Sequence, residues 1–148
     1  MNARIFTTLF LFVVGLSWAV SAQTDIVGKW KTIDDKSGKA KSVVEIYQGP
    51  NGKYYGKIEK LYVEPGEDAN PKCTECKGAK KDQQIIGMII ISGLEKTGSN
   101  MWRRGEILDP ANGNVYDCKM WIEKGNLQVR GYLGVSLVGR SQTWLPYK

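Results

Sequence analysis

Two cysteines separated by two residues, Cys73 and Cys76, are the first residues whose spacing indicates chemistry. The spacing is compatible with a local disulfide in an exported protein, with one half of a metal knuckle, or with a redox-active dithiol. A metal knuckle needs two or more further ligands, and Cys118 is the only other soft one in the sequence. A redox dithiol usually lies at a helix start beside a βαβ sheet, which this sequence does not predict. We therefore favour a Cys73–Cys76 disulfide and expect no metal site.

Histidine is absent from the chain, which excludes Ser-His and Cys-His nucleophile schemes. Acid–base catalysis would need two carboxylates in one cavity with separated pKa values. Asp34, Asp35 and Asp109 instead lie among turn residues, where such side chains hydrogen-bond the backbone. The glutamates of the predicted strands alternate with apolar residues and are expected to face water. The sequence therefore predicts no catalytic residue, no cofactor, and a protein that is not an enzyme.

Aromatic residues together with a few polar groups form the third candidate set. The usual small-molecule site in a protein is an apolar cup with a small number of convergent polar groups. We expect such a cup to be lined by Trp30, Tyr54, Arg140, Gln142 and Trp144. Arg140 has two predicted roles: it lies over the ring of Trp30 and helps to seal the fold, or it meets an anionic group of a ligand.

Strands rather than helices are predicted to position these residues. From residue 27 onward, apolar and polar residues alternate with a period of two, and no segment carries a sustained helical apolar stripe. Turn residues separate the alternating segments, with Gly or Asn where φ must be positive. One connection, 64–82, is long and irregular, and residues 80–87 are compatible with one helical turn at an end of the fold. The predicted strands are 27–33, 41–48, 53–63, 85–92, 101–108, 114–123, 126–134 and 138–146.

Eight short strands joined by near-neighbour hairpins favour an all-β, antiparallel up-and-down barrel, since closure removes exposed sheet edges. Glycines inside the predicted strands, such as Gly56, Gly105 and Gly131, are typical of the bends that a small barrel needs. We predict that the last strand pairs with the first. A barrel of this size is filled by side chains or holds one small ligand. A transmembrane barrel is disfavoured, because Lys57 and Glu106 would interrupt an outward apolar band.

Residues 1–22 have the features of a secretory signal peptide: Arg4, an apolar run, and the small-residue exit Val20-Ser21-Ala22. We predict cleavage after Ala22, a single domain over 23–148, and a periplasmic or secreted location in a bacterium. The chain has a formal net charge of +6, and its lysines are spread along the sequence rather than gathered in one block. This distribution predicts a solvated surface and no nucleic-acid partner. The protein is not expected to be embedded in a membrane.

A string of motifs across the region after the leader resembles a known family. The motifs are Gly28-x-Trp30, Cys73-x-x-Cys76-x-Gly78, Gly87-Met88, Gly93-Leu94, Trp102-x-x-Gly105-x-Ile107-Leu108-Asp109-Pro110, Asn112-Gly113-x-Val115-Tyr116, Leu127-x-Val129-Arg130-Gly131-Tyr132-x-Gly134 and Gly139-Arg140-x-Gln142-Thr143-Trp144. Together they resemble the exported bacterial proteins grouped as domain-of-unknown-function family 2147, and this resemblance implies no assigned activity. Over a shorter stretch, Gly28-x-Trp30 with the late Arg140 also resembles the closing device of lipocalins and streptavidin-like barrels. That second resemblance implies a calycin-like barrel.

Two functional hypotheses of different classes follow. The first is an exported, soluble barrel that binds a small lipophilic or anionic molecule without catalysis. The alternative is an envelope protein-interaction module whose contact surface is the loop 64–82. An oxidoreductase that uses Cys73 and Cys76 is the third and least supported, because neither a histidine nor a paired acidic site accompanies the cysteines.

Overall fold

Eight strands and one short 3-10 helix, η1, make up the fold of residues 24–148, the part of the chain that the computed structural model describes. The predicted signal peptide, 1–22, lies outside the described residues and stays a prediction. The elements are β1 (Gly28–Ile33), β2 (Ala40–Gln48), β3 (Tyr54–Leu61), η1 (Gly78–Lys80), β4 (Ile89–Gly98), β5 (Met101–Asp109), β6 (Asn114–Glu123), β7 (Asn126–Tyr132) and β8 (Gly139–Pro146). The all-β prediction is confirmed.

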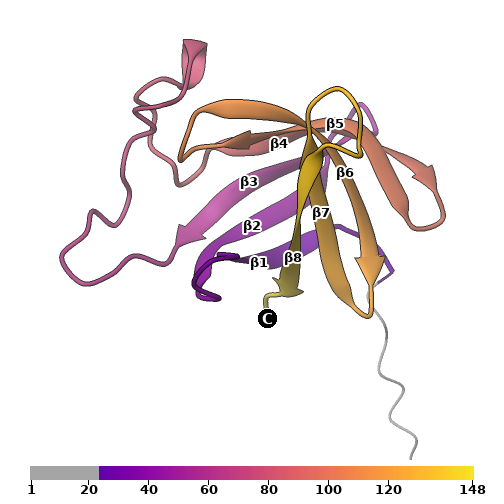
Figure 1. The fold of residues 1–148 in the computed structure, drawn as a ribbon, viewed down its shortest axis with the longest axis horizontal. Coiled ribbons are helices and arrows are strands. Elements are labelled where there is room, and N and C mark those ends of the chain that lie inside the picture. Colours follow the sequence, from indigo (N-terminus) through magenta and orange to yellow (C-terminus); the bar gives the residue numbers. More distant parts are fainter. Residues whose placement is uncertain (1–23) are drawn as a thin grey trace, which may run out of the picture.

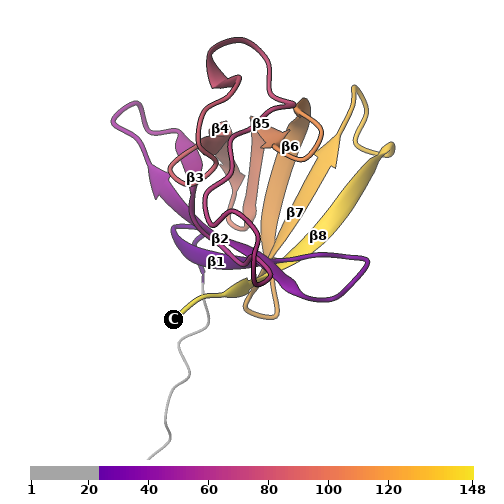
Figure 2. The same cartoon turned by 90° about the vertical axis from the view of Figure 1, so that its left-hand side faces the viewer.

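Each strand pairs antiparallel with the next, and β8 returns to pair with β1, so the sheet closes into an up-and-down barrel (Figure 1). This is the predicted topology. The β1–β2, β3–β4, β5–β6 and β7–β8 connections lie at one end, which we call the mouth end. The β2–β3, β4–β5 and β6–β7 turns lie at the other, which we call the closed end. Figure 2 looks toward the mouth end, with the long β3–β4 connection in front of it.

The core fills the closed end of the barrel. Alternation along the strands places large apolar side chains inward, and Trp30, Trp102, Leu94, Met120 and Leu127 are fully buried. The indole N–H of Trp30 donates a hydrogen bond to the backbone carbonyl of Ile26 at 2.8 Å, so this ring is both buried and hydrogen-bonded. The inward orientation predicted for Trp30 is confirmed.

Glycines inside strands mark places where neighbouring strands approach closely. A Cβ at Gly105 would lie 2.6 Å from Leu94 Cγ and 2.8 Å from Leu94 N, and the β5–β6 register shifts between Trp102 and Gly105. A Cβ at Gly56 would meet the side chain of Ile91 at 2.8 Å, again beside a register shift. These two glycines therefore allow the bends that the barrel needs.

The fourth strand differs most from its prediction. The predicted strand 85–92 is observed as Ile89–Gly98, because Gly93, with φ of +74°, lies within the strand rather than ending it. Ile85 and Met88 belong to the long connection, where the Met88 N–H donates to the Ile85 carbonyl at 3.1 Å. The helical turn predicted for 80–87 is found earlier, at Gly78–Lys80, and none of its residues is buried.

The seam between β1 and β8 is short. Its register pairs Trp30 with Pro146 and Lys31 with Leu145, and the Tyr147 N–H donates to the Lys29 carbonyl at 2.9 Å. No further β1–β8 pair occurs in the described part of the chain, and the two strands diverge toward the mouth end (Figure 2). The barrel is therefore sealed near its closed end and open along one side of its mouth.

Candidate binding cavity

A cavity of about 620 Å³ occupies the mouth end of the barrel. Its walls come from the mouth-end halves of the strands and from the four connections at that end. Most of the wall is apolar, formed by Ile58, Leu61, Ile85, Ile90, Ile107, Leu108, Val129, Val138 and Trp144. The inward side chains do not fill the interior here, so the barrel is hollow at this end.

Polar groups are few and lie at defined places in the wall. Thr32 and Ser42 form a pair across β1 and β2: their hydroxyls are 2.7 Å apart, and the Ser42 N–H donates to Thr32 Oγ1 at 3.1 Å. Gln142 accepts a hydrogen bond from the indole N–H of Trp144 at 3.1 Å. Arg140 and Lys41 supply cationic groups at the rim. An apolar wall with a few polar groups is the usual form of a small-molecule site.

Three of the five predicted binding residues line this cavity: Arg140, Gln142 and Trp144. The other two lie outside its lining. Trp30 packs in the core, and Tyr54 is buried with its ring edge-to-face against Trp102, the two centroids 6.2 Å apart. The alternation identified the inward faces of β1, β6 and β8 correctly, whereas burial in β2 and β5 departs from a period of two. It carried no information on how far along the barrel axis each side chain lies, and this decides between core and cavity.

The predicted contact of Arg140 with the ring of Trp30 is wrong. Trp30 pairs with Pro146 at the closed end, six residues beyond Arg140 along β8, which places Arg140 at the mouth. Its guanidinium instead donates to Asp35 in the β1–β2 turn, from Nε at 2.6 Å and in an ion pair from a terminal nitrogen at 2.5 Å. Arg140 therefore joins two hairpins across the opening of the seam, and both side chains of the pair remain accessible to water.

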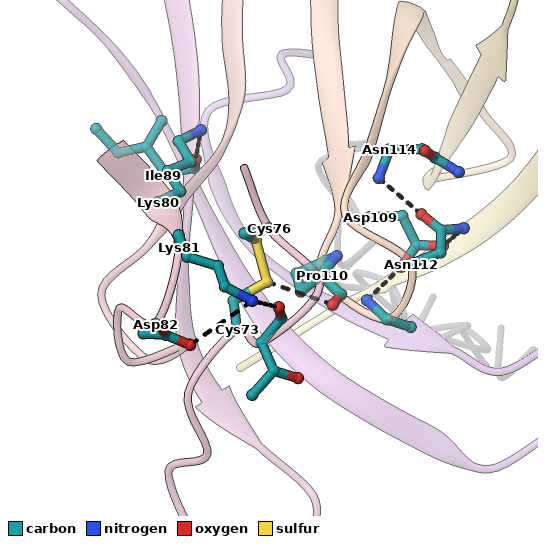
Figure 3. Close-up of a disulfide and its surroundings, with 12 residues drawn as sticks. Cys73, Cys76, Lys80, Lys81, Asp82, Ile89, Asp109, Pro110, Asn112 and Asn114 are labelled. Atoms are coloured by element: carbon teal, nitrogen blue, oxygen red, sulfur yellow. Dashed lines mark hydrogen bonds and ion pairs between the residues drawn. A yellow bond between two sulfur atoms is a disulfide. The ribbon is translucent and has the colours of Figure 1, made fainter. Parts of the chain in front are cut away.

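The disulfide predicted between Cys73 and Cys76 is confirmed, with an S–S distance of 2.04 Å. Figure 3 shows it against the β5–β6 turn, where Cys73 Sγ lies 3.4 Å from the carbonyl oxygen of Pro110. The approach of the two segments is close: a Cβ at Gly113 would lie 1.8 Å from the carbonyl oxygen of Glu75. Gly113 also has φ of +69°, so both its conformation and its surroundings require glycine.

The disulfide lies against the β5–β6 turn and so holds the long loop next to the cavity. Residues Asp109, Pro110, Ala111 and Asn112 of the β5–β6 turn line the cavity, as do Tyr62, Val63, Pro71 and Ile85 from the loop that the disulfide fastens. The loop therefore frames the mouth and does not hang free of the barrel. Ile85, in an irregular segment, had no strand pattern through which the sequence could reveal it as a wall residue.

Two acidic residues of the lining, Asp34 and Asp109, are occupied by turn hydrogen bonds. Asp34 accepts from the Ser37 N–H at 2.7 Å and the Ser37 hydroxyl at 2.8 Å, and these donors hold the pKa of the Asp34 carboxyl below its usual value. Asp109 accepts from the Ala111 N–H at 3.0 Å and from the Asn112 side-chain amide at 3.2 Å. The prediction that these aspartates serve turns is confirmed.

Cys118 is a free thiol buried in β6. Burial raises the pKa of this thiol well above its usual range, because the thiolate would be desolvated there. A buried, protonated thiol packs as a small apolar side chain. Within residues 24–148, no group of three or more Cys, Asp and Glu side chains is arranged to hold a metal ion.

The geometry defines a class: a closed eight-stranded antiparallel barrel, packed at one end and hollow at the other. Sequence comparison then shows the family. The model of a family of uncharacterized proteins conserved in bacteria, DUF2147, matches residues 28–145, which is nearly the whole barrel, and the chain belongs to this family. The predicted family membership is confirmed.

A search of solved structures shows that the fold is similar to that of protein HP1028 from the human pathogen Helicobacter pylori, described as belonging to the lipocalin family. The TM-score is 0.73 at 19% sequence identity, and the match covers 85% of each chain. At this identity the likeness establishes the fold alone, and it confirms the calycin-like architecture. A search of curated proteins gave no match. In the part of the chain that the structure describes, no helix is long and apolar enough to cross a membrane.

Proposed function

We propose that the protein is an exported, non-catalytic binding protein that holds one small lipophilic or anionic molecule in the cavity at its mouth end. The observation that carries the proposal is the cavity itself. Its volume, about 620 Å³, falls within the range of roughly 300–1,000 Å³ typical of small-molecule sites. A well-packed barrel of this size would have no such space, because eight strands enclose an interior that side chains can fill.

The chemistry of the wall favours a molecule with an apolar body. Ile58, Ile90, Ile107 and Val129 present only hydrocarbon to the space. Each Å² of apolar ligand surface removed from water contributes about 25 cal/mol, so shape and apolar area would supply most of the affinity. A hydrogen-bonding head group would be satisfied only near the polar residues of the wall and rim.

An anionic group of the ligand would lie toward the rim, where Arg140 and Lys41 approach the space. The guanidinium of Arg140 is already paired with Asp35. A carboxylate or sulfonate would therefore compete with Asp35 for Arg140 or share it, and Arg140 would be expected to tune affinity rather than to create it.

One further feature supports a binding role without catalysis, and another supports export. The aspartates that reach the cavity accept hydrogen bonds within their own turns, so their carboxyl groups already have a structural role there. A disulfide is typical of proteins that fold in an oxidising compartment.

The test is binding of anilinonaphthalene sulfonate, a lipophilic anion, followed by fluorescence and by native mass spectrometry of the purified protein. Val129→Trp should fill the cavity and abolish stoichiometric binding, because Val129 is buried in β7 and lines the space. Gln128→Trp is the matched control, since the same side chain is added on the opposite face of the same strand. Unchanged binding by Val129→Trp, with the protein still folded, would refute the proposal.

The alternative is an interaction module that contacts a protein partner through the loop 64–82. The observation in its favour is that residues 64–69 are all exposed and form no strand. Residues 70–76 cannot be removed cleanly, because Cys73 and Cys76 dock on the β5–β6 turn. Removing residues 65–69 alone would separate the hypotheses: loss of a partner with retained probe binding would favour the interaction module.

A further inference from the structure

The connection between β7 and β8, residues 133–138, exposes an unusual amount of apolar surface. Leu137 is 90% exposed, and Leu133, Val135 and Val138 are each exposed by 61–66%. These are the four most exposed large apolar side chains in the part of the chain that the structure describes. Single exposed apolar residues are ordinary on protein surfaces, but a contiguous group marks an interaction site.

The loop has a defined shape, in which Val135 and Leu137 lie outside the cavity lining while Leu133 and Val138 border the cavity. The Arg130 side chain donates from Nε to the Ser136 carbonyl at 2.7 Å and from a terminal nitrogen to the Leu137 carbonyl at 3.2 Å. Within the loop, the Val135 N–H donates to the Leu133 carbonyl at 2.8 Å. Because the polar backbone groups are bound to Arg130 and to one another, the outer surface of the loop is left to the apolar side chains.

A basic hairpin turn is tied to the start of the strand that follows this loop. The β1–β2 turn carries the exposed side chains Lys36, Lys39 and Lys41, and the Asp35–Arg140 ion pair ties it to the start of β8. In Figure 2 both tips point toward the right-hand side, with the β7–β8 tip above the β1–β2 tip and a gap between them. In and near the two tips, five basic residues outnumber three acidic ones: Lys36, Lys39, Lys41, Arg130 and Arg140 against Asp34, Asp35 and Glu64. Two of the basic residues are paired, Lys39 with Glu64 and Arg140 with Asp35.

We propose that these two tips form a docking surface for an anionic lipid bilayer. The side chains of the loop 133–138 would enter the headgroup region, and the lysines of the β1–β2 tip would meet the phosphate groups. Apolar insertion combined with basic residues is the usual arrangement of a peripheral membrane site, and each basic residue near an anionic surface contributes favourably. The net positive charge of the tips matches such a surface.

A bilayer fits this surface better than a second copy of the chain or a folded partner. The apolar residues form one convex loop of six residues, whereas a stable protein–protein interface uses about 20–30 residues a side. A convex tip can enter a deformable layer without needing a complementary cleft. Leu133, Val138, Lys41 and Arg140 border the cavity, but the two residues substituted in the test, Leu137 and Lys36, lie outside its lining, so the inference can be tested separately from ligand binding.

The opening between β1 and β8 lies between the two tips of the docking surface. The two tips flank the side of the mouth where the strands diverge (Figure 2), so a bilayer bound there faces the cavity opening. A lipophilic molecule could then pass between bilayer and cavity with little exposure to water.

The experiment is co-sedimentation of the purified protein with vesicles of phosphatidylcholine alone and of an equal mixture of phosphatidylcholine and phosphatidylglycerol. We expect the unaltered protein to bind the mixed vesicles and Leu137→Asp to bind them at least tenfold more weakly. Lys36→Glu should bind several-fold more weakly at low salt, and at high salt its affinity should differ little from that of the unaltered protein, because salt screens the charge. Val115→Asp, a half-exposed valine on the outer face of β6, is the control and should bind as the unaltered protein does.

Each other outcome is decisive. Failure of the unaltered protein to bind mixed vesicles, or equal binding by Leu137→Asp, would overturn the proposal. Self-association that Leu137→Asp abolishes, without vesicle binding, would assign the loop to a second copy instead. Melting temperature and anilinonaphthalene sulfonate binding of Leu137→Asp should stay unchanged, which separates a docking defect from misfolding and from failure of the cavity proposal.

Discussion

The two ends of this barrel use inward-facing residues in different ways. At the closed end, Trp30, Trp102 and Leu127 fill the interior, and the indole N–H of Trp30 is satisfied by the chain itself. At the mouth end, positions of the same inward parity surround about 620 Å³ of space. The packed core and the open cavity are therefore separated along the barrel axis. We expect a substitution near the closed end to change mainly the stability of the barrel, and one near the mouth end to change mainly the cavity.

The strongest test compares the same substitution at the two ends. Trp30→Ala should lower the free energy of unfolding by about 3–5 kcal/mol, the usual cost of removing a large buried aromatic side chain. Trp144→Ala should cost less, because one side of Trp144 already faces the cavity and makes fewer contacts there. Urea denaturation measures both. Equal losses would contradict the separation of the two ends.

The second test concerns the fastening of the long loop. Gly113→Ala should destabilise the protein by roughly 1–3 kcal/mol more than Gly125→Ala, because only the added Cβ at Gly113 overlaps the backbone of Glu75. Both glycines have positive φ, +69° and +77°, so the conformational cost of alanine is shared and cancels in the comparison. Denaturant unfolding of the oxidised proteins gives the difference. If the two variants lose the same free energy, the loop is not fastened at this turn.

The smallest expected effect is at the rim. Arg140→Met should change the free energy of unfolding by less than about 1 kcal/mol, since its ion pair with Asp35 is exposed to water. Asp35→Asn, alone and combined with Arg140→Met, completes a double-mutant cycle that isolates the pair. Thermal unfolding at low and high salt provides the measurement. A loss as large as that of Trp30→Ala would mean that Arg140 seals the barrel after all.

Much of the fold could be predicted from the sequence because its signals are local. Alternation, turn residues and interior glycines each act within a few residues, and together they specify hairpins in order. The pairing of the last strand with the first also followed, since a barrel of hairpins leaves two edges to be joined. The boundary of β4 was wrong because Gly93 has the residue type of a turn while lying inside a strand.

The candidate site could be predicted only in part, because it depends on height along the barrel. Trp30 and Trp144 share the same residue type and inward orientation and both pack in the core, yet only Trp144 also lines the cavity. Arg140 contacts Asp35 and not Trp30, because β8 pairs with β1 only through Leu145 and Pro146, at the C-terminal end of β8. Strand stagger of this kind arises from closure of the whole sheet, and no short stretch of sequence encodes it.

The short seam also bears on how the chain folds. Seven of the eight strand pairings join consecutive strands; six of these can form outward from short connections, and β3–β4 forms across the long one. The eighth joins residues 30 and 146, so the entropy of closing nearly the whole chain must be met before any of its contacts is gained. Closure is therefore the non-local step, and the seam, held by few hydrogen bonds, is the part of the barrel where transient opening costs the least free energy.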